Sequence, residues 1–204
     1  MAFIYEPGLV GADINIQGTT RDDIIIAGLN DNIVSARAGD DYVLGQDGND
    51  TLNGDDGDDF LFGENGSDTL DGNDDDDFLF GQSGSDSLTG GDGEDFLAGG
   101  IDADTLTGGG GEDIFFFDSP NSYVSFSVDT ITDFRPGTDE IQVDSAEFNI
   151  GSTDFDRFNY DSTTGALSFV NQDLTQTTFA FLQPGLGFVS SRDIDILELN
   201  SPSQ

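Results

Sequence analysis

The chain has 204 residues, of which 42 are acidic and 5 are basic, and its formal net charge is −37. This charge argues against binding to nucleic acid or anionic lipid, which depends on Lys and Arg, and it favours cationic partners. Because the sequence has neither Cys nor His, it has no disulfides, no zinc site and no catalysis by a thiol or imidazole, whereas its many carboxylates suit Ca2+ or Mg2+.

Residues 1–17 form the first segment, which we expect to be an N-terminal cap. Its first ten residues, MAFIYEPGLV, lack the charged and apolar regions of a secretory signal, so we expect no N-terminal export signal. No apolar run in the chain approaches the length of a membrane span, so we expect no membrane insertion. A start at Met1 favours a free-standing protein.

Residues 18–116 contain eleven consecutive nonapeptides without an insertion or deletion, for example GQDGNDTLN from Gly45 and GDDGDDFLF from Gly54. Position 1 is Gly in nine of them, position 6 is Asp in ten and Asn in one, and position 8 is always apolar. A solvated acidic tail has no reason to keep an apolar residue two places after each Asp, so the pattern predicts a folded repeat.

Each nonapeptide predicts one short strand and one tight turn. The segment around position 8 points a single apolar side chain inward, and the six residues rich in Gly, Asp and Asn make the turn. Two nonapeptides then form one coil, and stacked coils place the position-8 side chains in one internal column. Asp75 and Asp102 replace Gly at position 4, where Asp tolerates a left-handed backbone, whereas Arg21 makes the first turn less regular.

The pattern G-G-x-G-x-D-x-U-x resembles the RTX, or hemolysin-type calcium-binding, repeat. The resemblance implies an all-β fold, a right-handed parallel β-roll with two nonapeptides per coil, in which Ca2+ lies between turns of successive coils. It also implies that the position-6 side chains and backbone carbonyls are the ligands. One edge would carry Asp23, Asp41, Asp59, Asp77, Asp95 and Asp113, and the other Asn32, Asp50, Asp68, Asp86 and Asp104.

The ligand pairs predict that folding depends on calcium. Eleven turns give nine intervals between neighbours on the same edge, so we expect roughly six to nine ions. Two carboxylates one strand spacing apart, about 4.8 Å, repel by about 1 kcal/mol in water and about 3.5 kcal/mol at an effective dielectric of 20. Because the ligands come together only in the folded roll, metal binding contributes directly to folding.

Positions 7 and 9 point outward and differ between the two sheets. One sheet carries an apolar stripe, which includes Phe60, Phe62, Phe78, Phe80 and Phe96. A stripe of this size needs a cover, and we expect the chain itself to supply it, with self-association or surface contact as the alternative. The other sheet is rich in Thr, which could bind ice or carbohydrate but is also an ordinary exposed strand residue.

Residues 117–204 lose the nine-residue period and predict a C-terminal antiparallel β cap. We expect a hairpin from Phe158 to Phe169 with Gly165 in its turn, then strands at Phe179–Leu182 and Ile194–Leu199. The segment DTITDFRPGTDEI, from Asp129 to Ile141, resembles the region after the repeats in serralysin-type proteins. That resemblance implies an uncleaved C-terminal type I secretion signal, with DIDILEL as a compatible ending and a plain final strand as the alternative.

The function that these patterns predict is calcium binding by a secreted, extracellular, non-enzymatic protein. Serralysins are zinc proteases, but a chain without His cannot hold their zinc. An enzyme that uses only carboxylates, such as a glycosidase, needs two acidic side chains on either side of the bond that it cleaves. Most acidic residues of this chain belong to the predicted turns, so we expect no such activity. The alternatives are the C-terminal module of a larger RTX enzyme or toxin, and a surface adhesin or ice-binding solenoid.

Overall fold

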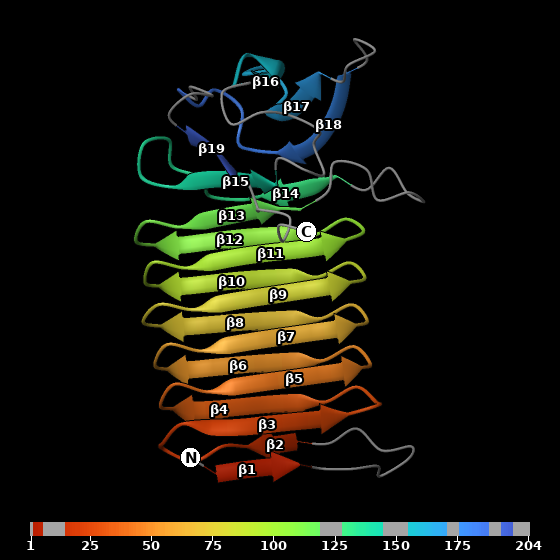
Figure 1. The fold of residues 1–204 in the computed structure, drawn as a ribbon, viewed down its shortest axis with the longest axis vertical. Helices are drawn as coiled ribbons and strands as arrows, with labels where there is room; N and C mark the ends of the chain where they lie inside the picture. The colour runs from red at the N-terminus through yellow and green to blue at the C-terminus, as the bar shows by residue number, and fades with distance from the viewer. Residues whose placement is uncertain are drawn as a thin grey trace, which may run out of the picture.

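The computed structural model describes residues 2–5, 15–118, 128–144, 155–170, 176–187 and 193–197, and the statements below concern these residues. The chain winds into a tall, flattened solenoid with two sheets facing each other and turns along two edges (Figure 1). An all-β parallel β-roll is therefore confirmed. No helix in this described part is both long and apolar enough to cross a membrane.

From β1 to β15, successive strands alternate between two sheets, whereas β16, β17 and β18 belong to the same sheet. The nine-stranded sheet has the order β1 (Ala2–Tyr5), β3 (Asp23–Gly28), β5 (Tyr42–Asp47), β7 (Phe60–Asn65), β9 (Phe78–Ser83), β11 (Phe96–Ile101), β13 (Ile114–Phe117), β15 (Glu140–Asp144) and β19 (Ile194–Leu197). The ten-stranded sheet has the order β2 (Asn15–Gln17), β4 (Ile33–Ala38), β6 (Thr51–Asp56), β8 (Thr69–Asp74), β10 (Ser87–Asp92), β12 (Thr105–Gly110), β14 (Asp129–Ile131), β18 (Gln176–Phe181), β17 (Ala166–Val170) and β16 (Phe158–Tyr160).

The register confirms two nonapeptides per coil. Val43 pairs with Leu61, and Leu61 pairs with Leu79, each eighteen residues further along and in parallel. The position-8 side chains from Val43 to Phe115 have no exposed surface and form the apolar core between the sheets. Each coil thus contributes two buried apolar side chains, one from each sheet.

The turns use left-handed backbone at positions 2 and 4. Gly66, at position 4, has a φ of 143°, and a Cβ there would overlap the carbonyl oxygen of Gly48 in the preceding coil. Asp75 and Asp102 adopt φ values of 79° and 80° at the same position, as predicted for Asp. The glycines therefore allow successive turns to stack backbone against backbone.

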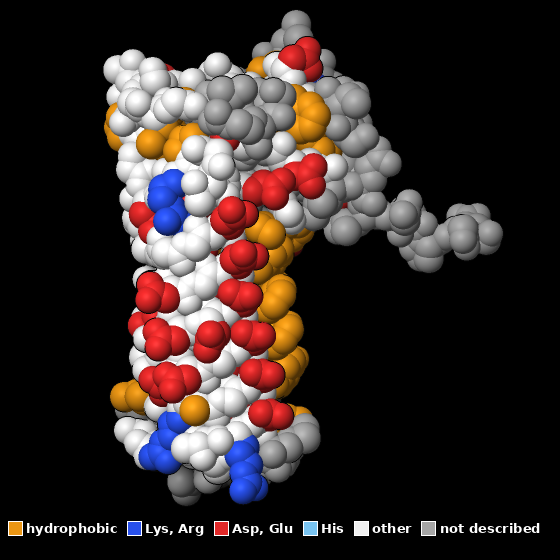
Figure 2. Space-filling model, turned by 90° about the vertical axis from the view of Figure 1, so that its left-hand side faces the viewer, with side chains coloured by type: hydrophobic (Ala, Val, Ile, Leu, Met, Phe, Trp, Pro, Cys, Tyr) orange, Lys and Arg blue, Asp and Glu red, His pale blue; other side chains and the backbone are white. Residues whose placement is uncertain are grey.

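The apolar stripe is present and partly exposed. Phe60 and Phe78 stack with ring centroids 4.6 Å apart, and Phe62 and Phe80 stack at 4.8 Å. Phe60 and Phe78 remain 39% and 38% exposed, so within the described residues the expected cover from the chain itself is not seen. Figure 2 shows this hydrophobic band running along the roll beside columns of acidic side chains.

Parallel stacking continues past the last nonapeptide. β14 pairs with β12, β15 with β13 and β19 with β15, all in parallel, so these strands prolong the roll. The antiparallel part of the cap is limited to β16, β17 and β18. The predicted hairpin is confirmed, because Phe158 pairs with Phe169 and Gly165 has a φ of 81° in its turn.

Several predicted features lie outside the described residues. These are most of the N-terminal segment 1–17, the beginning of the segment after the repeats, and the final residues of DIDILEL beyond 197. The two described pieces near the N-terminus, β1 and β2, pair in parallel with β3 and β4. They extend the two sheets at this end.

We predict that Gly66→Ala strongly destabilises the calcium-loaded roll. The new Cβ would lie on the backbone of Gly48, at a φ that residues with side chains rarely adopt, so the free energy of unfolding should fall by at least about 2 kcal/mol in chemical denaturation. Gly187→Ala is the control, because a Cβ there meets nothing within 4 Å, and it should change stability by less than about 0.5 kcal/mol. Equal stability of the two variants would contradict the stacked-turn geometry.

Candidate metal centre

The position-6 side chains of all eleven nonapeptides lie buried in the turns. Their exposed fractions are between 0% and 3%, although they are polar and nearly all are acidic. The turns at one edge lead from β4 to β5, from β6 to β7 and so on, and those at the other edge lead from β5 to β6 and onward (Figure 1). Each edge therefore holds its own column of these side chains, as the period of eighteen residues predicts.

From Asp41 onward, one oxygen of each position-6 carboxylate accepts a hydrogen bond from the backbone of the preceding coil on the same edge. The backbone N–H of Asp41 donates to Oδ1 of Asp59 at 2.7 Å, and the N–H of Asp59 donates to Oδ1 of Asp77 at 2.8 Å. The same bond recurs along the other edge, for example from Asp50 to Asp68 at 2.7 Å. Two columns of carboxylates thus run along the roll, each member bonded to the next.

The second oxygen is without a partner in most turns. Among the described residues, the buried side-chain oxygens without a hydrogen bond include Asn32 Oδ1 and the Oδ2 atoms of Asp41, Asp50, Asp59, Asp68, Asp77, Asp86, Asp95 and Asp104. A buried carboxylate oxygen without a donor is costly, because it has lost its water and gained nothing in return. Eight such carboxylate oxygens and the amide oxygen of Asn32, arranged in two regular columns, fit cations bound between successive turns.

Position 1 leaves room beside these oxygens. The ideal Cβ of a residue at Gly45 would lie 2.5 Å from Oδ2 of Asp50 and 2.9 Å from the carbonyl oxygen of Gly63. The strand pairing also omits this position, since Leu44 pairs with Phe62 and Gln46 with Glu64 while Gly45 has no partner. A carboxylate oxygen and a carbonyl oxygen therefore approach the same small space that a side chain would fill.

This set of donors fits Ca2+. The available atoms are carboxylate and carbonyl oxygens, which hard cations prefer, and imidazole and thiolate are absent from the sequence. Within the described part of the chain, no three acidic side chains are grouped so that they could hold one metal ion by themselves. Each interval between position-6 residues offers two carboxylates, or one carboxylate and one amide between Asn32 and Asp50, and nearby backbone carbonyls can supply further ligands.

The carboxylates have raised pKa values, mainly because burial disfavours their charged form. The pKa is raised to about 6 for Asp41, Asp50, Asp86 and Asp113, to about 7 for Asp59 and Asp95, and to about 8 for Asp77 and Asp104. The backbone N–H that each accepts lowers its pKa, and neighbouring carboxylates raise it again. Without a cation, burial therefore makes these groups harder to ionise than an exposed Asp, most of all Asp77 and Asp104.

Two predicted residues at the ends of one column differ from the others. Oδ2 of Asp23 accepts the backbone N–H of Thr19 at 2.7 Å, and Oδ2 of Asp113 accepts from the guanidinium of Arg135 at 3.0 Å. The structure also adds two carboxylates that the repeat pattern misses. Asp129 accepts the N–H of Asp104, and Asp139 accepts the N–H of Asp113. The signal for both was present, because each has Ile two residues later, like the repeats.

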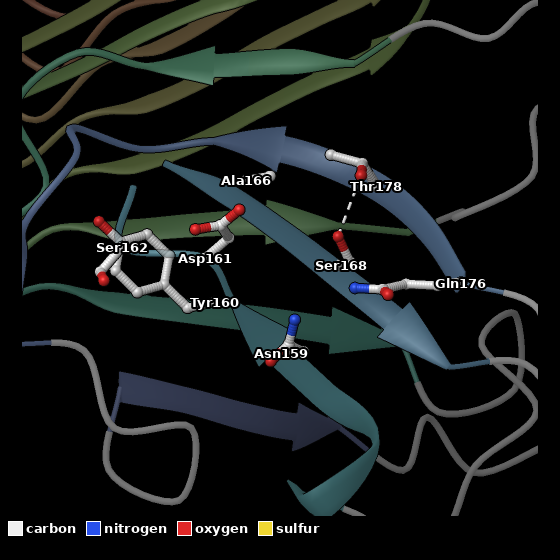
Figure 3. A pocket seen from close by; sticks show the side chains of 8 residues that line it. All are labelled: Asn159, Tyr160, Asp161, Ser162, Ala166, Ser168, Gln176 and Thr178. Carbon is white, nitrogen blue, oxygen red and sulfur yellow. Dashed lines mark hydrogen bonds between the residues drawn. The ribbon is translucent and has the colours of Figure 1, made fainter. Parts of the chain in front are cut away.

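A polar hollow of about 610 Å³ lies on the cap, away from these columns (Figure 3). Its lining comes from β16, β17, β18 and the turn after β16, and includes Tyr160, Ser168 and Thr178. Asp161 is the one carboxylate among the described lining residues, and the backbone N–H of Thr163 lowers the pKa of that group by donating to it at 2.8 Å. The lining therefore lacks the pair of acids that a carboxylate-only hydrolase uses.

Comparisons with known proteins agree with the repeat. The family model of the RTX calcium-binding nonapeptide repeat (4 copies) matches residues 17–52, 53–88 and 89–119, which together are half of the chain. No curated protein matches the sequence.

Two solved structures are similar at low scores. The extracellular lipase LipA from Serratia marcescens has 15% identity and a TM-score of 0.38, and the match covers 95% of this chain but 42% of the lipase. The AlgE6R3 subunit of the Azotobacter vinelandii mannuronan C5-epimerase has 18% identity and a TM-score of 0.33, over 96% of this chain and 86% of that subunit. The fold assignment rests on the strand pairing described above.

The raised pKa values predict that acid stabilises the metal-free roll. Folded carboxylates with pKa values of about 6 to 8 bind protons that the unfolded chain, near its ordinary value of 3.8, does not hold. Stability should therefore rise as the pH falls from about 8 to about 5 and be lost as the pH rises through 6 to 8. Far-UV circular dichroism of metal-stripped protein across this range tests it, and β structure that weakens toward pH 5 would refute the assignment.

Proposed function

This chain belongs to the RTX calcium-binding nonapeptide-repeat family, and on that premise we propose that it is a secreted protein whose roll folds only when calcium ions occupy its turns. The observation that carries the proposal is the set of nine buried, unpartnered side-chain oxygens in two columns. A cation between successive position-6 side chains would satisfy these oxygens and neutralise their repulsion. The ligands we propose are the eleven predicted position-6 residues together with backbone carbonyls, for roughly six to nine ions.

The dependence on calcium follows from the arrangement of charge. Within each column, neighbouring carboxylates lie one coil apart and are buried, so their repulsion is screened less than at the surface. Sites that exist only in the folded roll add their binding free energy to folding. Extracellular calcium modules work at about 10⁻⁴ to 10⁻³ M, so the chain would stay unfolded in the cytosol and fold outside.

We propose export through a type I secretion machinery, which moves unfolded chains, and a non-enzymatic role outside the cell. Support for export comes from the resemblance of the segment from Asp129 to Ile141 to the region after the repeats in serralysin-type proteins. Support for a non-enzymatic role comes from the engagement of the buried acids in turns and from the single carboxylate of the cap hollow. A module within a longer RTX enzyme or toxin would use the same calcium chemistry.

The exposed rings favour one additional role, contact with a surface or with a second copy of the chain. Tyr42, Phe60 and Phe78 form a row in which each residue is 38% to 40% exposed. The row is continuous, because Tyr42 stacks on Phe60 and Phe60 stacks on Phe78. Covering such an apolar row removes its rings from water, which favours binding to a surface or to a second copy.

A calcium titration of metal-stripped protein tests the proposed function. We expect a cooperative change from coil to β structure in far-UV circular dichroism at about 0.1 to 1 mM Ca2+, because folding and binding are one process. Mg2+ should not produce it, since Mg2+ demands six close ligands in a strict octahedron and gives up its water reluctantly. A spectrum already rich in β structure in chelator and unchanged by Ca2+ would refute calcium-driven folding.

Asp77→Asn separates the charge of the site from its hydrogen bond. The Asn oxygen can still accept the N–H of Asp59, while the buried charge is lost. We expect the midpoint of the calcium titration to rise at least about threefold, because affinity depends on ligand charge.

Asp74→Asn is the matched control for this variant. Asp74 is exposed at position 3 of the same nonapeptide. Its replacement by Asn changes the net charge by the same amount as Asp77→Asn. Its effect on the calcium midpoint should be small, because exposed charges are screened by solvent and salt. Equal shifts for the two variants would mean that overall charge, and not the position-6 ligand, sets calcium affinity.

A further inference from the structure

The last turn on one edge of the roll already contains a positive charge. Nη2 of Arg135 lies 3.0 Å from Oδ2 of Asp113, 2.9 Å from Oδ1 of Asp139 and 2.6 Å from the carbonyl oxygen of Gly111, so its two hydrogens are shared among three acceptors. Gly111 and Asp113 are positions 4 and 6 of the last nonapeptide, and Asp139 is the next carboxylate of the same column. One side chain thus joins two successive carboxylates and a turn carbonyl.

The same three kinds of oxygen recur in the preceding turns of this edge without a protein cation. Asp95 and Asp77 are bonded through the N–H of Asp77, as Asp139 and Asp113 are through the N–H of Asp113. Oδ2 of Asp77 and Oδ2 of Asp95 have no donor, whereas Oδ2 of Asp113 has Arg135. The difference between this turn and its neighbours is therefore the guanidinium.

The local chain holds Arg135 in this place. Its backbone N–H donates to Oδ2 of Asp139 at 2.6 Å, and its carbonyl accepts the N–H of Asp139 at 2.9 Å. Phe134, immediately before it, is buried with 2% exposure and packs against Phe115 of the core. The Arg135 side chain is 40% exposed, while those of Asp113 and Asp139 are 0% and 1% exposed. The packing of Phe134 on Phe115 thus fixes the turn on its buried side. The guanidinium of Arg135 lies on the solvent side of the same turn.

We propose that Arg135 takes the place of a calcium ion between Asp113 and Asp139, so that this turn closes without metal and binds none. The inference rests on the proposed calcium sites in the other turns. The guanidinium stays charged, its Nη2 contacts one oxygen of each carboxylate and the carbonyl oxygen, and its Nε donates to Oδ2 of Asp139 at 3.3 Å. Unlike an ion, it cannot dissociate when the calcium concentration falls. At this edge, the connection between the repeats and the cap thereby closes without calcium.

Counting bound ions by native mass spectrometry at saturating Ca2+ tests this proposal. Arg135→Gln should bind one more ion than the wild type, because the two carboxylates and the carbonyl lose their internal cation. Arg135→Lys should bind the same number as the wild type, because it keeps a positive charge in the turn. An unchanged count in Arg135→Gln would overturn the proposal.

Arg37→Gln is the matched control for the lost charge. Arg37 lies at position 2 on an exposed sheet face with a φ of 88°, and the roll already places Gln46 and Gln82 at position 2 with φ values of 81° and 75°. This variant changes the net charge by the same amount, so it should bind the same number of ions as the wild type. A gain of one ion here too would assign the effect to net charge and overturn the proposal.

A second pair of variants does not require Arg135 to be replaced. Asp139→Asn keeps an oxygen for the N–H of Asp113, and it should leave the ion count unchanged because no ion lies there. Asp77→Asn, in contrast, should weaken calcium binding and raise the calcium midpoint as predicted above. Loss of an ion in Asp139→Asn would overturn the proposal for Arg135, whereas a wild type that binds no calcium would refute the proposed function itself.

Discussion

The roll depends on how one carboxylate divides its two oxygens. Oδ1 accepts the N–H of the residue eighteen positions earlier and so fixes the spacing of the coils, while Oδ2 is left buried without a donor in most turns. The first oxygen specifies the fold and the second makes that fold unfavourable by itself. A divalent cation resolves this conflict because it attracts both members of a pair and accepts carbonyl oxygens as further ligands. Structure and metal dependence therefore arise from the same side chain.

The glycines make this arrangement possible at two different places. At position 4, as in Gly66, the absence of a Cβ allows one turn to lie on the carbonyl of the next. At position 1, as in Gly45, it leaves room for the carboxylate and carbonyl oxygens to approach each other. Position 2 is different, because Gln46, Glu64 and Gln82 adopt left-handed φ values of 74° to 81°. The stacked ladder on both sides imposes that conformation on residues that do not prefer it.

The period of nine residues was sufficient to predict the roll from residue 18 to 116, its core, its two edges and the position of every carboxylate in the columns. Nothing of comparable regularity marks the rest. β19 pairs with β15 across more than fifty residues of chain, and no local pattern encodes that distance. Asp129 and Asp139 continue the columns after longer loops, and only the apolar residue two places later marks them. Arg135 carries no repeat signal, because its role depends on a turn that forms in three dimensions.

Because neighbouring intervals share carboxylates, calcium binding along the roll should follow a one-dimensional model in which each site is coupled to its nearest neighbours. Asp59 bonds to Asp41 on one side and to Asp77 on the other, so each interval has its neighbours as a boundary, and the two columns run side by side on the same coils. In such a lattice the coupling between adjacent units sets the affinity of each step, and the number of units sets how sharply the whole array responds. Duplication or deletion of a pair of nonapeptides would therefore tune the steepness of the calcium response while leaving the chemistry of each interval unchanged.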